Sequence, residues 1–411
     1  MINNILMADK MEGTLADGLV AGSAINSDAY QKQVERKHLF TTFGGEQIYR
    51  QDNSIVVKLP PGRSAVTTSW LNGGQRDDLE CIFNHTIPYY VDNEKDLEGG
   101  NLFSYLAITA ERLGFDSSRC AGLLTAASME NVSIISKSFR GVQVTAVVTG
   151  GIDVNGGRAG DPASYYQEHG EVKMINGTIN TILLINASLP PYTLTRALMT
   201  ATEAKTVALQ ELMASSCYSC GLATGSGTDM IAVVSNNSSE YELTDSGKHS
   251  KLGELIGTCV IEATKEALAK QSRLAPIYQQ DILVRLERFG IKEEKIWEMA
   301  CELAGENCED DFRKELRRVT RIPAMVGITS SILHIVDEIS WGLLPEQDGK
   351  RAAFSSMRGL PSLLGPDESF PLDELLDENE GIIDNWMRIT AWIVKNNIFS
   401  KTGQIVDMKN H

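Results

Sequence analysis

The chain of 411 residues is long enough for two domains with cores of their own, and its 42% hydrophobic and 22% charged residues are ordinary for a globular protein. Its net charge of −16 repels nucleic-acid backbones and anionic lipid headgroups, so neither nucleic acid nor a membrane is an expected partner. Seven cysteines without a framework spacing indicate reduced thiols and a cytoplasmic protein.

Neither a signal peptide nor a membrane span is expected from the hydropathy pattern. The first 18 residues lack a basic stretch followed by an apolar one. The most apolar run, residues 322–344, contains a proline, a histidine and two carboxylates, which are costly in lipid.

The first predicted elements follow a polar, glycine-rich lead-in over residues 1–45. Residues 54–59 and 64–70 are rich in β-branched side chains and predict two strands joined by a Pro-Pro-Gly turn. Residues 101–113 carry apolar side chains at helical spacing and predict a helix with Asn101 as its N-cap.

Two further strands and a glycine-rich loop come next. Residues 132–135 and 142–149 alternate in the manner of paired strands. The loop at 149–161 has five glycines in thirteen residues, so it can present backbone N–H groups to a ligand. It matches neither the dinucleotide fingerprint nor the phosphate loop, and no nucleotide is inferred. Arg158 and Asp161 favour a ligand-facing loop over a flexible surface loop.

A strand at 178–186 and a long helix at 194–212 continue the pattern. The apolar stripe of this helix places Lys205 on the buried side, where its amine must snorkel to water or meet a partner. The loop at 223–229 then enters a strand at 230–234 and supplies hydroxyls and a carboxylate. This composition suits the binding of an amide or the anchoring of a water, and a tight structural turn is the alternative.

Two histidines are candidates for acid–base chemistry. His85 lies among apolar and aromatic residues, where a satisfied, half-buried histidine is more common than a catalyst. His249 stands between two lysines ahead of a helix that ends near Lys270, and an exposed loop histidine is the alternative. Cys217 and Cys220 have metal or redox spacing, but no second pair accompanies them, so we interpret them as a chance pair.

After residue 275 the chain becomes mainly helical, with helices predicted at 277–290, 292–303 and 381–396 and an acidic linker at 366–380. This region has no catalytic spacing and is expected to serve packing, with oligomerisation, lid formation or partner binding as further roles.

The predicted fold is therefore α/β. It has a mixed-sheet core with flanking helices over residues 46–272 and a mainly helical extension over 273–411, because the strands pair locally before long helices.

Eight short motifs rich in Gly, Asn and Thr follow one another between residues 45 and 272. They are LNGG at 71–74, Asn84-His85, GLLTAASM at 122–129, GGIDVNGGRAGD at 150–161, GTIN at 177–180, TATEAK at 200–205, ATGSGTD at 223–229 and GKHSKLGELIG at 247–257. In this order they resemble the adenosylcobinamide amidohydrolase family of corrinoid salvage. Ser226 stands where threonine is expected, and the short members of the family lack the C-terminal helical region.

The resemblance implies hydrolysis of the amide that joins aminopropanol to the corrin ring of adenosylcobinamide, which gives adenosylcobyric acid. The expected partner is this small-molecule corrinoid, whose cobalt arrives with the substrate, and the protein is expected to require no cofactor or metal ion of its own. A homo-oligomer formed through the C-terminal helices is a further expectation. The alternatives are a non-catalytic corrinoid-binding or sensing protein and an amidohydrolase acting on a complete cobamide.

Amide hydrolysis needs an activated nucleophile and a site for the developing oxyanion. His85 or His249 would act as the general base. Glu203 or Asp229 would orient that base or the attacking water. Lys205 and nearby backbone N–H groups would stabilise the oxyanion.

A second version of the mechanism makes Thr178, which directly follows Gly177, a nucleophile exposed by self-cleavage. In either version the residues expected to bind the substrate come from the same motifs: Asn72, Asn84, Thr125, Ser128, Asn155, Arg158, Asp161, Thr178, Asn180, Thr202, Ser226 and Thr228.

Overall fold

The computed structural model describes residues 36–87, 91, 93–163, 177–364 and 370–398. A first sheet of five strands has the order β1 (Arg36–Thr41), β2 (Gln47–Gln51), β3 (Ser54–Lys58), β6 (Cys81–Thr86) and β7 (Cys120–Thr125). Its strands are antiparallel except for the parallel pair β6–β7, which α1 (Leu102–Leu113) connects. A parallel pair needs such a crossover, because the chain must return to the end of the sheet at which the first strand began.

A second sheet of six strands carries the ends that form the site. Its order is β5 (Gly74–Arg76), β4 (Arg63–Thr67), β13 (Met230–Asn236), β11 (Thr178–Ile185), β9 (Val142–Gly151) and β8 (Ser133–Phe139). Only β11 and β13 are parallel, and α2 (Pro191–Glu211) connects them. A short ribbon pairs β10 (Gly156–Gly157) with β12 (Gly225–Ser226).

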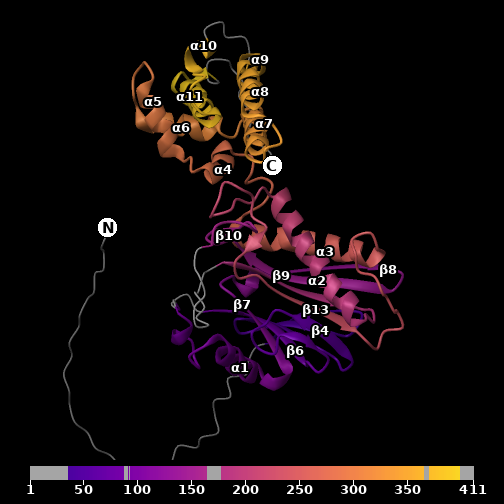
Figure 1. Ribbon diagram of the computed structural model, residues 1–411. Coiled ribbons are helices and arrows are strands. Elements are labelled where there is room, and N and C mark those ends of the chain that lie inside the picture. Colours follow the sequence, from indigo (N-terminus) through magenta and orange to yellow (C-terminus); the bar gives the residue numbers. More distant parts are fainter. Residues whose placement is uncertain (1–35, 88–90, 92, 164–176, 365–369, 399–411) are drawn as a thin grey trace, which may run out of the picture. The chain divides into compact units, whose positions relative to one another are not determined.

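The two sheets stack between helices, so the core has four layers (Figure 1). α1 packs on the outer face of the first sheet through Leu106, which is fully buried beside Phe83. Ile55 and Ile182 represent the apolar layer between the sheets. α2 and α3 (Lys251–Ser272) cover the other face of the second sheet. Every residue of β11 is buried, as expected of a central strand that is covered on both faces.

Local signals explain several element boundaries. The Asn101 side chain accepts a hydrogen bond from the Ser104 N–H and Gly114 is left-handed at φ 87°, so α1 has both of its predicted caps. Arg140 and Gly141 both have positive φ, which suits the tight turn between the predicted strand pair β8 and β9.

Other expectations differ from the structure. β3 and β4 are consecutive, yet they belong to different sheets and do not pair. The helix expected at 277–290 is limited to α4 (Ile282–Leu286) and one 3₁₀ turn, because Asp281 caps the Leu283 N–H and starts the helix there. β1 begins inside the range predicted as a lead-in, whose first 35 residues lie outside the described part of the chain.

The C-terminal helices have an apolar core of their own around Trp386, whose indole N–H donates to the Thr329 hydroxyl (3.0 Å). These helices are α5 (Glu293–Glu302), α6 (Glu309–Val319), α7 (Pro323–Ser340), α8 (Glu346–Arg358), α9 (Leu360–Leu364), α10 (Leu372–Leu375) and α11 (Ile382–Lys395). No single helix among the described residues has the length and apolarity to cross a membrane, and only α6 and α7 together, bent by 80°, meet that test. The predicted α/β class with mixed sheets and a helical C-terminal region is confirmed.

Candidate active site

One end of the second sheet brings together many of the predicted site residues. The parallel strands β11 and β13 begin at this end of the sheet, and the antiparallel strand β9 ends there. The β10–β12 ribbon joins the glycine-rich loop that follows β9 to the loop that precedes β13. A cavity of about 600 Å³ opens here, and seven predicted residues line it: Asn155, Arg158, Asp161, Thr202, Lys205, Ser226 and Thr228.

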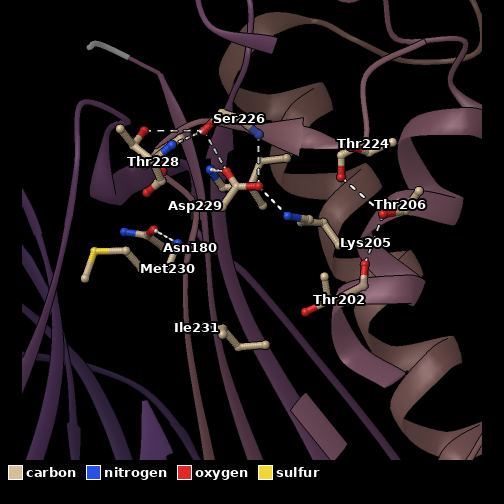
Figure 2. A network of polar contacts seen from close by, with 12 residues as sticks. Asn180, Thr202, Lys205, Thr206, Thr224, Ser226, Thr228, Asp229, Met230 and Ile231 are labelled. Atoms are coloured by element: carbon tan, nitrogen blue, oxygen red, sulfur yellow. Dashed lines mark hydrogen bonds and ion pairs between the residues drawn. The ribbon is translucent and has the colours of Figure 1, made fainter. Parts of the chain in front are cut away.

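Asp229, the residue just before β13, is the centre of the polar network at this edge (Figure 2). Its Oδ1 accepts hydrogen bonds from the Ser226 hydroxyl (2.7 Å) and from the Ile179 backbone N–H (2.7 Å). Its Oδ2 accepts from the Ser226 backbone N–H (3.0 Å) and from the Lys205 ammonium. Four donors occupy the two oxygens, so this carboxylate is suited to orienting its neighbours rather than to accepting a proton.

Lys205 reaches Asp229 from α2, with 13% of its side chain exposed (Figure 2). The partner that a buried ammonium requires is therefore a carboxylate at the start of the neighbouring strand. Gly225 makes room for this ion pair, because a Cβ at that position would lie 2.6 Å from the Lys205 Nζ. The pair places a cation directly on the cavity wall.

A second set of hydrogen bonds surrounds Asn155, which is 1% exposed. Its Nδ2 donates to the Gly177 carbonyl (2.9 Å) and to the Thr228 hydroxyl (3.4 Å), and its Oδ1 accepts from the Tyr218 hydroxyl (3.0 Å). The Thr228 hydroxyl also donates to the Gly177 carbonyl (2.7 Å). The Thr178 hydroxyl donates to the Thr228 carbonyl (2.7 Å). These bonds join the start of β11 to the loop before β13.

Arg158 and Asp161 also line the cavity. The Asp161 Oδ2 accepts from the Arg158 backbone N–H (2.8 Å) and from the Ser216 hydroxyl (2.6 Å). Slight burial opposes the charged form, but the hydrogen bonds from Ser216, Ser219 and the Arg158 backbone outweigh it and lower the pKa of Asp161. The exposed Thr202 hydroxyl donates back to the α2 backbone.

The sequence of this site also matches known proteins. The sequence model of adenosylcobinamide amidohydrolase matches residues 39–276. This chain belongs to the adenosylcobinamide amidohydrolase family. A Methanosarcina mazei relative named adenosylcobinamide amidohydrolase is 27% identical over 230 residues, which are 54% of this chain and 97% of the relative.

An uncharacterized Methanocaldococcus jannaschii protein is 35% identical over 213 residues, which are 48% of this chain and 80% of that protein. A crystal structure of the PH0078 protein from Pyrococcus horikoshii OT3 is similar at 15% identity and a TM-score of 0.29. The similarity covers 57% of this chain and 80% of the PH0078 chain.

Two asparagines of the family motifs lie between the sheets and do not line the cavity. Asn180 donates to the Asn84 Oδ1 (2.8 Å) and to the Leu124 carbonyl (2.8 Å), and it accepts from the Met230 N–H (3.1 Å). Asn84 donates to the Thr149 hydroxyl (2.7 Å). Both asparagines are almost fully buried, so they fix the two sheets beside the site rather than contact a ligand.

His85 follows Asn84 in β6 and points to the opposite face, as successive strand residues do. Its two ring nitrogens lie 2.8 Å from the Ser54 hydroxyl and 3.0 Å from the Tyr105 hydroxyl. Burial, with a smaller contribution from Arg112, lowers the pKa of His85 to about 4. The structure therefore does not bring this histidine to the cavity.

Glu203 and His249 also lie outside the cavity lining. Glu203 is exposed on α2 and forms an ion pair with Lys248 (2.7 Å). His249 is exposed in the loop before α3, and the described residues offer it no hydrogen-bond partner.

Three remaining residues that were predicted to bind the substrate form hydrogen bonds with other parts of the chain instead. Asn72 donates to the Ser117 and Cys120 carbonyls, Thr125 accepts from the Ala127 N–H, and Ser128 caps the turn that follows it. These contacts hold loops around the first sheet.

Tyr218 and Thr224 line the cavity and were not among the predicted site residues. Tyr218 lies between Cys217 and Cys220, whose spacing predicts no site, and its sequence gives no signal beyond a hydroxyl that needs a partner. A larger cavity, of about 710 Å³, lies around Tyr278 and Arg288 and contains none of the predicted residues. We take the smaller cavity as the candidate active site, because the predicted polar residues and their hydrogen-bond donors line it.

Proposed function

We propose that this chain hydrolyses the amide that joins aminopropanol to the corrin ring of adenosylcobinamide, releasing adenosylcobyric acid. Membership of the amidohydrolase family supports the reaction type. The observation that carries the proposal is the Lys205–Asp229 pair on the wall of an open cavity, next to the hydroxyls of Ser226 and Thr228.

Amide hydrolysis passes through a tetrahedral intermediate whose oxygen becomes negative. The Lys205 ammonium lines the cavity and supplies a donor for that oxygen. Asp229 holds the ammonium in place, which saves the reorganisation that a free lysine would need. One such donor typically contributes a factor of about 100 to 1000 in turnover.

The cavity takes the arm of the substrate that carries the amide, and the flat corrin ring stays at the open side. Tyr218, 37% exposed, provides an aromatic wall there. The proposal requires no cofactor of the protein's own, since the cobalt belongs to the substrate. We place the reaction in the cytoplasm, because all seven cysteines are free, as in a reducing compartment.

The test is to incubate the purified protein with adenosylcobinamide and to follow both products by mass. The expected result is stoichiometric adenosylcobyric acid and aminopropanol. Tight binding without products would replace the proposal with a corrinoid sensor. Hydrolysis of a complete cobamide, with adenosylcobinamide left intact, would change the substrate and keep the reaction.

A further inference from the structure

The peptide bond between Gly177 and Thr178 has an unusual environment. Its carbonyl oxygen accepts two side-chain hydrogen bonds, from the Asn155 amide (2.9 Å) and from the Thr228 hydroxyl (2.7 Å). Two fixed donors on one carbonyl oxygen are the arrangement that stabilises a tetrahedral intermediate. The next residue in the chain carries a hydroxyl, the nucleophile that such a carbonyl requires.

The surroundings hold these groups in place. The Tyr218 hydroxyl donates to the Oδ1 of Asn155, which is 1% exposed, so the Asn155 amide group is held in a fixed orientation toward the Gly177 carbonyl. Gly177 has φ +97°, and a Cβ there would lie 3.0 Å from the Asn155 Cβ, so only glycine lets the donors approach this closely. The Thr178 hydroxyl donates to the carbonyl of Thr228 (2.7 Å), and Thr228 itself lines the cavity.

We propose that the chain cleaves its own Gly177–Thr178 bond and that Thr178, at the new amino terminus, is the nucleophile of the amide hydrolysis. The cleavage stands on the geometry of the bond itself, whereas the second role rests on the proposed function. The proposal also accounts for a cavity whose described lining contains no histidine, because an N-terminal threonine carries its own base.

The net cleavage reaction consumes one water molecule and takes place in two steps. The Thr178 Oγ1 attacks the Gly177 carbonyl carbon, the bond from that carbon to the Thr178 nitrogen breaks, and the hydroxyl proton passes to the nitrogen. The product is an ester between Gly177 and the Thr178 side chain. Water then hydrolyses this ester, which leaves a carboxylate on Gly177, a free α-amine and a restored hydroxyl.

The same groups then serve the substrate. The α-amine takes the proton of the Thr178 hydroxyl as it attacks the substrate amide, whose carbonyl oxygen occupies the position left by the Gly177 carbonyl. Asn155 and Thr228 donate to that oxygen. The carbon–nitrogen bond breaks, aminopropanol leaves with the proton, and water hydrolyses the acyl ester. Asp229 holds the new terminus through the Ile179 N–H (2.7 Å).

Intact mass and N-terminal sequencing of the purified full chain test the cleavage. The wild type should give two fragments, the second beginning at Thr178. Thr178→Ala should stay a single chain that still unfolds cooperatively, and Thr178→Ser should still cleave. Thr195→Ala, which removes an exposed hydroxyl on α2, is the matched control and should cleave like the wild type.

The donors give a second readout in a cell-free time course. Thr228→Val should slow cleavage on the order of 100-fold, whereas Thr228→Ser, which keeps the hydroxyl, should restore it. Hydroxylamine should accelerate wild-type cleavage by intercepting the ester and should leave a hydroxamate on Gly177.

An intact wild-type chain in a folded preparation, active or not, overturns the proposal, as does cleavage of Thr178→Ala at the same bond. The two proposals fail separately. An intact chain that hydrolyses adenosylcobinamide keeps the proposed function and rejects self-cleavage. A cleaved chain without that activity supports self-cleavage and rejects the proposed function.

Discussion

Two polar clusters of the core contrast sharply, one around His85 and one around Asp229. Each joins a titratable residue, His85 in β6 or Asp229 just before β13, to a side chain from a helix, Tyr105 in α1 or Lys205 in α2. The Ser54 and Tyr105 hydroxyls contact both ring nitrogens of His85, and His85 lines neither the 600 Å³ cavity nor the 710 Å³ cavity. The Asp229 cluster has Lys205 and Ser226 on the wall of a cavity. The hydrogen bonds of the His85 cluster therefore indicate a structural role. The hydrogen bonds of the Asp229 cluster lie beside a cavity and indicate a binding or catalytic role.

The two clusters also differ in the charges that they carry. Burial keeps His85 neutral well below pH 7, so its ring is available for hydrogen bonds to two hydroxyls. Lys205 and Asp229 are instead charged partners that leave an ammonium at the surface of the cavity. The first cluster stabilises α1 against the first sheet, and the second can stabilise charge on a ligand.

The largest expected effect is a difference in turnover between variants of the two clusters. Lys205→Ala should lower the turnover of adenosylcobinamide by about 100- to 1000-fold, because it removes the cation from the cavity wall. His85→Gln, which keeps hydrogen-bonding capacity, should leave turnover within a factor of a few. Steady-state assays of both variants, each checked for its amino termini, provide the comparison. The reverse ranking would move the chemistry to the His85 cluster.

The second effect concerns stability against acid. An unfolded chain takes up a proton on His85 below pH 6.5, whereas the folded chain does so only near pH 4. Acid therefore favours unfolding between these values, and the free energy of unfolding should fall by on the order of 3 kcal/mol from this group alone. Below pH 4 both states are protonated and the loss stops.

Urea unfolding of the wild type and of His85→Gln at pH 7, 5.5 and 4 measures this contribution. The advantage of the wild type over the variant should shrink steadily across the window. Parallel curves for the two proteins would mean that His85 is not buried as described.

The smallest effect concerns the packing of the ion pair. Gly225→Ala should lower the free energy of unfolding by about 1 to 3 kcal/mol, because its Cβ would force the Lys205 Nζ and the Asp229 carboxylate apart. Gly227→Ala is the matched control in the same loop, since its Cβ would meet only the Asn155 Oδ1, at 3.9 Å. Equal stabilities of the two variants would argue against the Lys205–Asp229 contact.

Elements with strong local signals were predictable from the sequence. The caps of α1 and the turn between β8 and β9 depend on residues within a few positions of each other. The pairing of β3 with β6 and of β4 with β13 was not predictable, because these partners are distant in the chain. The helix expected at 277–290 was predicted too long, since apolar spacing does not reveal that Asp281 caps it internally.

The site was predictable to a similar extent. Helical periodicity placed Lys205 on a buried face, but it did not identify Asp229, 24 positions later, as the partner. Asn84 and His85 belong to one motif but face opposite sides of the first sheet. The alternation of side chains along a strand predicts this difference, but it does not predict which side holds the site. The role of Asn155 in holding Gly177 needs the fold, because the two meet across loops.

The most direct measurement is a crystal structure of the wild-type protein with adenosylcobyric acid, the product, which is not turned over. We predict that its new carboxylate lies within hydrogen-bond distance of the Asn155 Nδ2 and the Thr228 hydroxyl, in the cavity beside Lys205. A product carboxylate bound instead at His85 or His249, with this cavity empty, would contradict the account.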